Sequence, residues 1–268
     1  MMVSKKLLLI LVLFQLTQTW FAIEAVAEEV VKKGISVAIS DNLIIIDGRA
    51  RSGQIDLVNG GEDPMEFTVY PIDNPTGVVA SAEPILRWAP ERAVAPAHRS
   101  LAFRVLARPT PELEPGEYAF QFGVRAKVQR DAPPIVFKDD GGDPQPLIGA
   151  TVPVVPVLPV TVYVRYRMET PQVDPEPLVL TPEDENNLGY FKVVKRVPDA
   201  SFVGQIQVVD AGSGEVLSSG RLHLGQKGDA ARVTIPRAYF PKERAGDYCL
   251  RLWDHFPGTG DPYTSLCE

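Results

Sequence analysis

Two cysteines are the side chains whose type and position most directly suggest chemistry. Cys249 and Cys267 both lie within the last 20 residues, and the 268-residue sequence contains no other cysteine. In an exported protein such a pair is expected to form a disulfide, which would tie the end of the chain to the strand predicted at residues 247–253. A metal site is disfavoured because His255 is the only imidazole nearby in the sequence and no second pair of ligands accompanies it.

The other reactive side chains form no catalytic pattern. The three histidines, His98, His223 and His255, are scattered, and none has the spacing of an H-E-x-x-H zinc site. The sequence has no G-x-S-x-G elbow, phosphate-binding loop or dinucleotide fingerprint. The acidic stretch DDGGDP at residues 139–144 lacks the alternating ligands of a calcium loop, so a solvated loop is favoured over a calcium site. We therefore expect no enzyme, no cofactor and no metal ion.

The N-terminus has the three parts of an export signal. Lys5 and Lys6 precede an apolar run at residues 7–14 that is too short to span a bilayer, and AVA at residues 25–27 provides a small-x-small cleavage site. A membrane anchor is the alternative interpretation. We expect residues 1–27 to be a signal peptide that is removed on export to the periplasm of a Gram-negative bacterium. No later apolar run has the length and composition of a membrane span.

Composition and charge narrow the class of protein. The formal net charge is −7 and no basic stripe is present, which argues against a nucleic-acid partner. The chain is rich in valine, contains 25 prolines and 21 glycines, and has no long amphipathic helix. Short alternating segments recur between turn signals, for example at residues 53–59, 65–73 and 100–107. This pattern predicts an all-β protein built from β-sandwiches.

A proline-rich segment divides the chain into two predicted domains. Residues 168–177 (METPQVDPEP) have the composition of a linker. We place one immunoglobulin-like domain at residues 28–168 and a second β-sandwich, which holds the disulfide, at residues 169–268.

The most informative strand is the one at residues 151–167 (TVPVVPVLPVTVYVRYR). A strand accommodates proline only where its N–H side faces no partner, so Pro153, Pro156 and Pro159 predict an edge strand or a strand that begins near Pro159. From Val160 on the side chains alternate between two faces. An apolar edge of this kind is normally covered, either by the chain itself or by a partner.

Four segments resemble the periplasmic pilus-assembly chaperones. Residues 35–59 are similar to the opening pair of strands of that family, and residues 85–105 to its strand, turn and strand, although Ala97 stands where glycine is usual. Residues 116–126 are similar to the next strand, and residues 159–167 to the strand that carries the interaction edge. The resemblance implies two immunoglobulin-like domains set at an angle and a client bound by donor-strand complementation.

The resemblance also implies a binding site, from which this chain departs. The family holds the carboxylate end of its client with two basic residues in the cleft between the domains, and those positions here are Leu43 and Thr161. Arg165 and Arg167 are possible cleft cations in their place. The predicted client-facing side chains are the even-numbered ones of the edge strand, which could instead be ordinary core residues: Val152, Val154, Leu158, Val160 and Val162.

The sequence thus favours a periplasmic chaperone for fimbrial or other surface subunits. Such a protein binds a protein subunit and is a monomer when free. The alternative is an exported structural or adhesive pilus component, or an envelope accessory protein with the same fold. A carbohydrate-binding module is a more distant alternative, because it would need exposed coplanar aromatic side chains.

Overall fold

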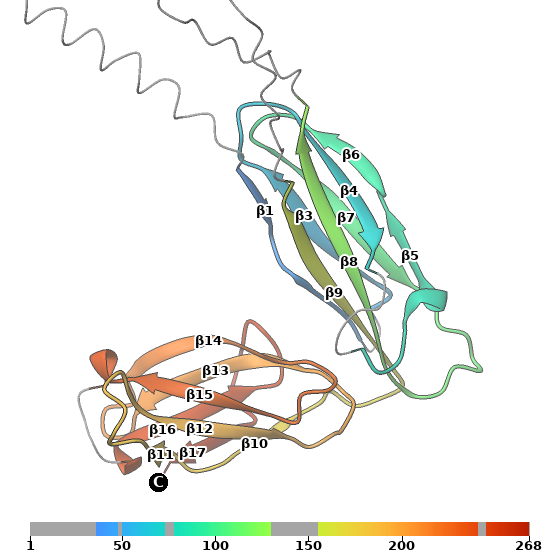
Figure 1. Cartoon of the computed structure of the whole chain (residues 1–268). Helices are drawn as coiled ribbons and strands as arrows, with labels where there is room; N and C mark the ends of the chain where they lie inside the picture. Colours follow the sequence, from blue (N-terminus) through green and yellow to red (C-terminus); the bar gives the residue numbers. More distant parts are fainter. Residues whose placement is uncertain (1–35, 48–49, 73–77, 130–154, 241–244, 268) are drawn as a thin grey trace, which may run out of the picture.

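The computed structural model describes residues 36–47, 50–72, 78–129, 155–240 and 245–267, and these form an all-β protein (Figure 1). Their strands make four sheets that pair into two sandwiches, so the expected fold class is confirmed. The predicted signal peptide and the acidic stretch at residues 139–144 lie outside the described residues. Helical structure in the described part of the chain is limited to three one-turn 3₁₀ helices, Glu83–Ile85, Arg237–Tyr239 and Ala245–Asp247. None of its helices is long or apolar enough to cross a membrane.

The first sandwich contains strands β1 to β9. One sheet has the order β1-β3-β7-β5 and the other has the order β2-β9-β8-β4-β6. Strand β2 runs parallel to β9, whereas β8 runs antiparallel to β9 on its other side. The strands are Val37–Ile39 (β1), Leu43–Ile46 (β2), Ser52–Asn59 (β3), Met65–Pro71 (β4), Leu86–Ala89 (β5), Arg92–Ala95 (β6), Arg99–Ala107 (β7), Gly116–Val128 (β8) and Val157–Tyr166 (β9).

The core of the first sandwich is made of the side chains that point inward from its two sheets. Phe103 on β7 and Phe122 on β8 are fully buried, and their rings meet edge to face with centroids 5.3 Å apart. Because these two strands belong to different sheets, this aromatic pair joins the sheets across the core.

The second sandwich contains strands β10 to β17. In one sheet β12 pairs with β10, β11 and β15, and the other sheet has the order β14-β13-β16-β17. The strands are Val173–Pro175 (β10), Val179–Leu180 (β11), Asn187–Lys195 (β12), Phe202–Asp210 (β13), Val216–Leu224 (β14), Ala230–Pro236 (β15), Tyr248–Trp253 (β16) and Thr264–Cys267 (β17).

The predicted disulfide between Cys249 and Cys267 is confirmed. The two residues are directly opposite each other on β16 and β17, with Cα atoms 4.3 Å apart. The bond therefore fastens the edge strand β17 to the strand that carries the fully buried Leu250.

Residues 168–177 were predicted to be a linker, but the structure has a strand in the middle of this segment. Val173–Pro175 forms β10 and pairs with residues 193–195 of β12. Val173 is fully buried in the core of the second sandwich. Pro175 can belong to a strand here because β10 lies at the edge of its sheet, where proline removes no donor that an outer neighbour would need.

Candidate functional site: the open edge of β9 and the domain junction

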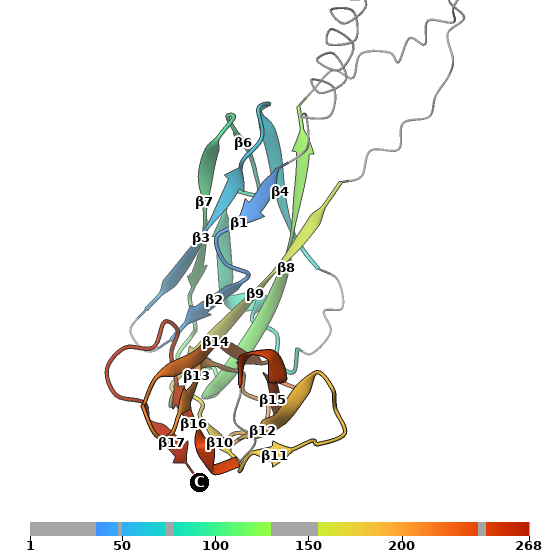
Figure 2. The same ribbon diagram turned by 90° about the vertical axis from the view of Figure 1, so that its left-hand side faces the viewer.

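Strand β9 is covered along one side and half-covered along the other. Strand β8 pairs with it over Val157–Tyr166, but β2 pairs only with residues 161–164. Within the described residues, 157–160 have no strand on the β2 side, where β9 extends beyond β2 (Figure 2). We call residues 155–160 the open edge. The sequence predicted an edge strand, and the structure has one over the first part of β9.

The hydrogen bonds of β9 show which backbone groups face the open side. Thr161 donates its N–H to the carbonyl of Asn42 at 2.9 Å, so its backbone groups point toward β2. The carbonyl of Pro156 accepts from Ala126 on β8. Because successive residues of a strand point their polar groups to opposite sides, the groups of Val157 and Pro159 point the same way as those of Thr161. Proline has no backbone N–H, and at Pro159 the missing group would have pointed to the side of β9 where no neighbouring strand could accept a hydrogen bond. The sequence analysis predicted this placement for proline in a strand.

The burial of the β9 side chains corrects the predicted client-facing set. Val160 and Val162 are fully buried in the core of the first sandwich, and Leu158 packs against the same core. These side chains fill their own domain and are not displayed to a partner. Val152 and Val154 lie outside the described residues.

The opposite face of the same strand carries the exposed side chains. Val157 is 46% exposed, Pro159 is exposed and Val155 is half-buried. The even-numbered side chains Val160 and Val162 therefore fit the alternative interpretation, in which they are core residues of the first sandwich.

The open edge ends at the junction with the second domain. Leu43 and Thr161, the positions where the resemblance expects cations, are directly opposite each other on β2 and β9. Leu43 is buried in a small apolar cluster with Tyr163 of β9 and Val203 of the second domain. A cavity of about 180 Å³ lies beside Thr161, and its lining residues are Val78, Ala119, Gln121, Thr161, Tyr163, His223 and Gly225.

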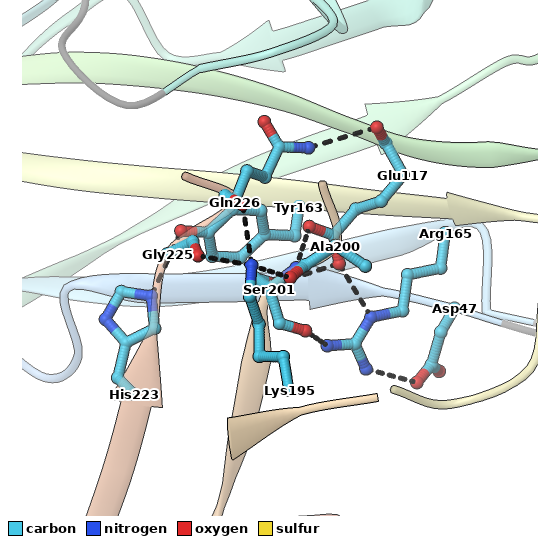
Figure 3. Close-up of polar contacts among 10 residues, drawn as sticks. All are labelled: Asp47, Glu117, Tyr163, Arg165, Lys195, Ala200, Ser201, His223, Gly225 and Gln226. Atoms are coloured by element: carbon cyan, nitrogen blue, oxygen red, sulfur yellow. Dashed lines mark hydrogen bonds and ion pairs between the residues drawn. The ribbon is translucent and has the colours of Figure 1, made fainter. Parts of the chain in front are cut away.

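Arg165 binds on both sides of the domain junction through two of its three guanidinium nitrogens (Figure 3). Its side chain is 3% exposed, and its Nε donates to Glu117 Oε2 at 3.0 Å. Its Nη2 donates to the carbonyl of Ser201 in the second domain at 3.0 Å. Ser201 in turn donates its N–H and its hydroxyl to the two oxygens of Glu117, at 2.6 and 2.8 Å. This buried triad docks the loop before β13 onto the ends of β8 and β9.

Gln226 makes a second buried connection between the domains. Its Nε2 donates to the carbonyl of Glu117 at 3.0 Å, and its Oε1 accepts from the N–H of Val79 at 2.8 Å. Lys195 connects the loop that contains Gln226 to the loop before β13 by donating to the carbonyls of Ala200, Gly225 and Gln226. Burial lowers the pKa of the Lys195 amine, and nearby carboxylates, chiefly Asp229, oppose this shift.

Two further contacts cross the junction nearer the open edge. The hydroxyl of Tyr163 lies 3.0 Å from Nε2 of His223. Burial raises the pKa of Tyr163 to about 12, and burial followed by the charge of Arg221 lowers the pKa of His223. Arg221 forms an ion pair with Asp41 at 2.6 Å and donates to the side chain of Asn42 at 2.7 Å. The segment at which β2 begins is therefore held by the second domain.

The second predicted cation, Arg167, has a different environment. It is exposed, and its guanidinium lies 4.9 Å from the ring centroid of the neighbouring Tyr166. Glu117, Ser201 and Gln226 were not predicted, because each is a polar residue whose partner lies more than 45 positions away in the sequence. The one available signal was Glu117 itself, an acid at the start of a strongly apolar strand.

No protein-family model matches the sequence, and no curated protein matches it. Several solved structures do match this chain, and chaperones are among them. The CupB2 chaperone of Pseudomonas aeruginosa is 9% identical, with a TM-score of 0.42, and the match covers 80% of this chain and 91% of that one. The E. coli chaperone DraB is 10% identical, with a TM-score of 0.43 and coverage of 87% and 98%.

A third similar structure is a Salmonella enterica complex of the SafA pilin with the SafB chaperone. It is 12% identical, with a TM-score of 0.45, and covers 88% of this chain and 98% of that one. At 9–12% identity the similarity concerns the fold. The chain is a two-sandwich β protein with a half-open edge strand.

Proposed function

We propose that this protein is a periplasmic chaperone that binds a fimbrial or other surface subunit along the open edge of β9. The client is a sheet that lacks a strand, and the first part of β9 supplies one by β-augmentation. The observation that carries the proposal is the unpaired side of residues 157–160, next to the exposed side chains of Val157 and Pro159.

Backbone hydrogen bonding supports this function. The N–H and carbonyl of Val157 and the carbonyl of Pro159 point to the open side, so an added strand has two acceptors and one donor to pair with. An unpaired apolar edge is an aggregation hazard that proteins usually blunt. Pro159 removes one hydrogen-bond donor from this edge, whereas Val157 keeps both of its backbone groups for pairing with a client strand.

The domain junction holds the second domain in a fixed position relative to the open edge. Glu117, Arg165 and Ser201 are all buried and mutually hydrogen-bonded, so the two domains are held by a network that is costly to break. A rigid scaffold lowers the ordering cost of binding a client.

The client is recognised chiefly by backbone pairing and apolar contact. Leu43 and Thr161 offer no charge at the end of the open edge, so a client carboxylate gains no charge-assisted hydrogen bond from them. A contact of that kind would contribute about 1.5–3 kcal/mol.

The test uses the tagged full-length protein, expressed in its own host and purified from the periplasm. Val157→Arg places a charge on the exposed face of the open edge, and Val157→Pro removes its free N–H. Val197→Arg is the matched control, because Val197 is 42% exposed on the second domain and Val157 is 46% exposed. Mass spectrometry identifies the co-purifying subunit, and the purified pair is then recombined.

We expect a one-to-one complex that both Val157 variants lose and Val197→Arg keeps, with all proteins showing the same melting temperature. A wild-type protein without a subunit partner, or a complex that the Val157 variants retain, would overturn the proposal. Assembly of the chain with itself into polymers would instead support the structural pilus component.

A further inference from the structure

A wide cavity lies at the end of the first sandwich that faces the second domain. Its volume is about 780 Å³, which is within the range of small-molecule sites. It opens between the ends of β2 and β9 on one sheet and of β7 on the other. The lining residues are Ile46, Ala50, Arg51, Leu106, Ala107, Arg108, Pro109, Val164, Arg165 and Tyr166.

The floor of this cavity is apolar. Ile46 and Val164 are each 2% exposed, and Ala107 is 3% exposed. These three side chains belong to the core that fills the space between the sheets. A ligand that reaches the floor therefore meets hydrocarbon.

The mouth of the cavity is cationic. Arg51 and Arg108 are exposed, and neither has a carboxylate or hydrogen-bonded side-chain partner within the described residues. Their backbones are fixed, because Ala107 donates to the carbonyl of Arg51 at 2.9 Å and Arg108 donates to the carbonyl of Ile85 at 2.8 Å. Two like charges held on neighbouring strand ends repel each other unless an anion lies between them.

Arg165 adds a third guanidinium from the inner wall. Its Nε and Nη2 are used by Glu117 and Ser201, but its Nη1 has only a 3.9 Å contact with Asp47. That distance is too long for a hydrogen bond, so Nη1 has no hydrogen-bond partner among the residues that the structure describes. No carboxylate is among the described residues that line the cavity, and Asp47 beside it is half-exposed.

We infer that this cavity binds a small amphiphilic anion, namely a carboxylate carried on a short unbranched hydrocarbon chain. The carboxylate pairs with Arg51 and Arg108, since guanidinium groups match carboxylates in a two-pronged geometry. The hydrocarbon chain lies over Ile46, Ala107 and Val164. The site is separate from the open edge, because Val157 and Arg165 are eight positions apart on β9, which corresponds to about 26 Å.

The experiment titrates the mature protein with sodium octanoate, below its micelle concentration, by calorimetry and by ¹H–¹⁵N NMR. Acetate and 1-octanol are the comparison ligands. Arg51→Gln combined with Arg108→Gln removes the cationic mouth. Arg104→Gln is the matched control, because Arg104 is an exposed arginine on β7, the strand that Arg108 directly follows, and it donates to Gln54 instead.

We expect saturable binding of octanoate at one site, with shifts at the amides of Arg51, Ala107 and Arg165. Acetate should bind at least tenfold more weakly, because each buried methylene changes affinity about fourfold. Octanol and the double variant should each lose at least tenfold, whereas Arg104→Gln and Val157→Arg should match the wild type. Absence of saturable binding, equal affinity for octanol, equal affinity for acetate, or an unaffected double variant would overturn the inference.

Discussion

Glu117 and Arg165 occupy directly opposite positions on β8 and β9, and their side chains form a 3.0 Å ion pair that is almost completely buried. The exposed fractions are 0% and 3%. Both side chains also bind Ser201, so one ion pair within the first domain becomes the attachment point of the second. The strand that offers the open edge at one end is thus the strand that fixes the domain junction at the other.

Removing Glu117 should destabilise the protein strongly. Glu117→Ala leaves Arg165 buried without its counter-ion and leaves the N–H of Ser201 without its acceptor. The expected loss is about 3–5 kcal/mol in the free energy of unfolding, measured by urea denaturation. Ser201→Ala is the milder comparison, because it removes one hydroxyl donor and should cost about 1.5–3 kcal/mol. Equal stability of Glu117→Ala and wild type would show that the ion pair does not hold the junction.

The burial of Tyr163 and His223 at the domain junction should make stability depend on pH in two windows. The pKa of His223 is lowered in the folded state, so the unfolded chain binds the additional proton first as pH falls below 6.5, the ordinary value. Stability therefore declines as pH falls from 6.5 to the lowered pKa of the folded state. The pKa of Tyr163 is raised to about 12, so the unfolded chain loses its proton first above the ordinary value of 10.0. Stability therefore also declines as pH rises from about 10 to about 12.

Two variants separate these windows. His223→Gln should flatten the acid side of the stability curve, and Tyr163→Phe should make the alkaline side less steep. Tyr263, whose pKa burial also raises to about 12, should keep part of the alkaline decline in both variants. The measurement is the urea midpoint as a function of pH. An acid decline of unchanged slope in His223→Gln would exclude His223 as its source.

The strands and the disulfide could be predicted from the sequence because they depend on local pattern. The alternation of side chains from Val160 onward predicted strand β9, and the pair of cysteines predicted the disulfide that joins β16 to β17. The inward face of β9 could not be assigned, because apolar side chains occur on both of its faces: Val160 and Val162 face the core, and Tyr163 faces the second domain.

The contacts of the domain junction could not be predicted from local sequence patterns. Arg165 was predicted as a cation near the cleft, and it does lie at the junction, but its charge is already matched by Glu117, which is 48 positions earlier. Similarly, β10 was not predicted because it lies in a proline-rich segment. Val173 becomes a core residue only through the pairing of β10 with β12. Such positions are decided by tertiary contacts, which composition and periodicity do not contain.

The disulfide should contribute to the stability of the second domain. Replacing Cys249 and Cys267 together by alanine frees the loop between them, and loop-closure entropy predicts a loss of about 3 kcal/mol. The measurement is urea denaturation followed by the fluorescence of Trp253, which lies on β16. The wild-type protein in reducing buffer should move to the same midpoint as the variant. Identical midpoints for oxidised and reduced wild-type protein would contradict the prediction.

Pro159 should protect the open edge against pairing with a second copy of the chain. Pro159→Ala restores an N–H that points to the open side, and a backbone hydrogen bond contributes about 0.5–1.5 kcal/mol. A symmetric pair of edges would form two such bonds, so self-association should tighten about tenfold. Pro156→Ala is the control, because its new N–H would face β8 inside the sheet. Both variants should also lose about 0.4–1 kcal/mol of stability, since each frees the unfolded chain. Sedimentation velocity over a range of concentrations measures the association. If both variants associate equally, the missing N–H at position 159 is not what keeps the open edge unpaired.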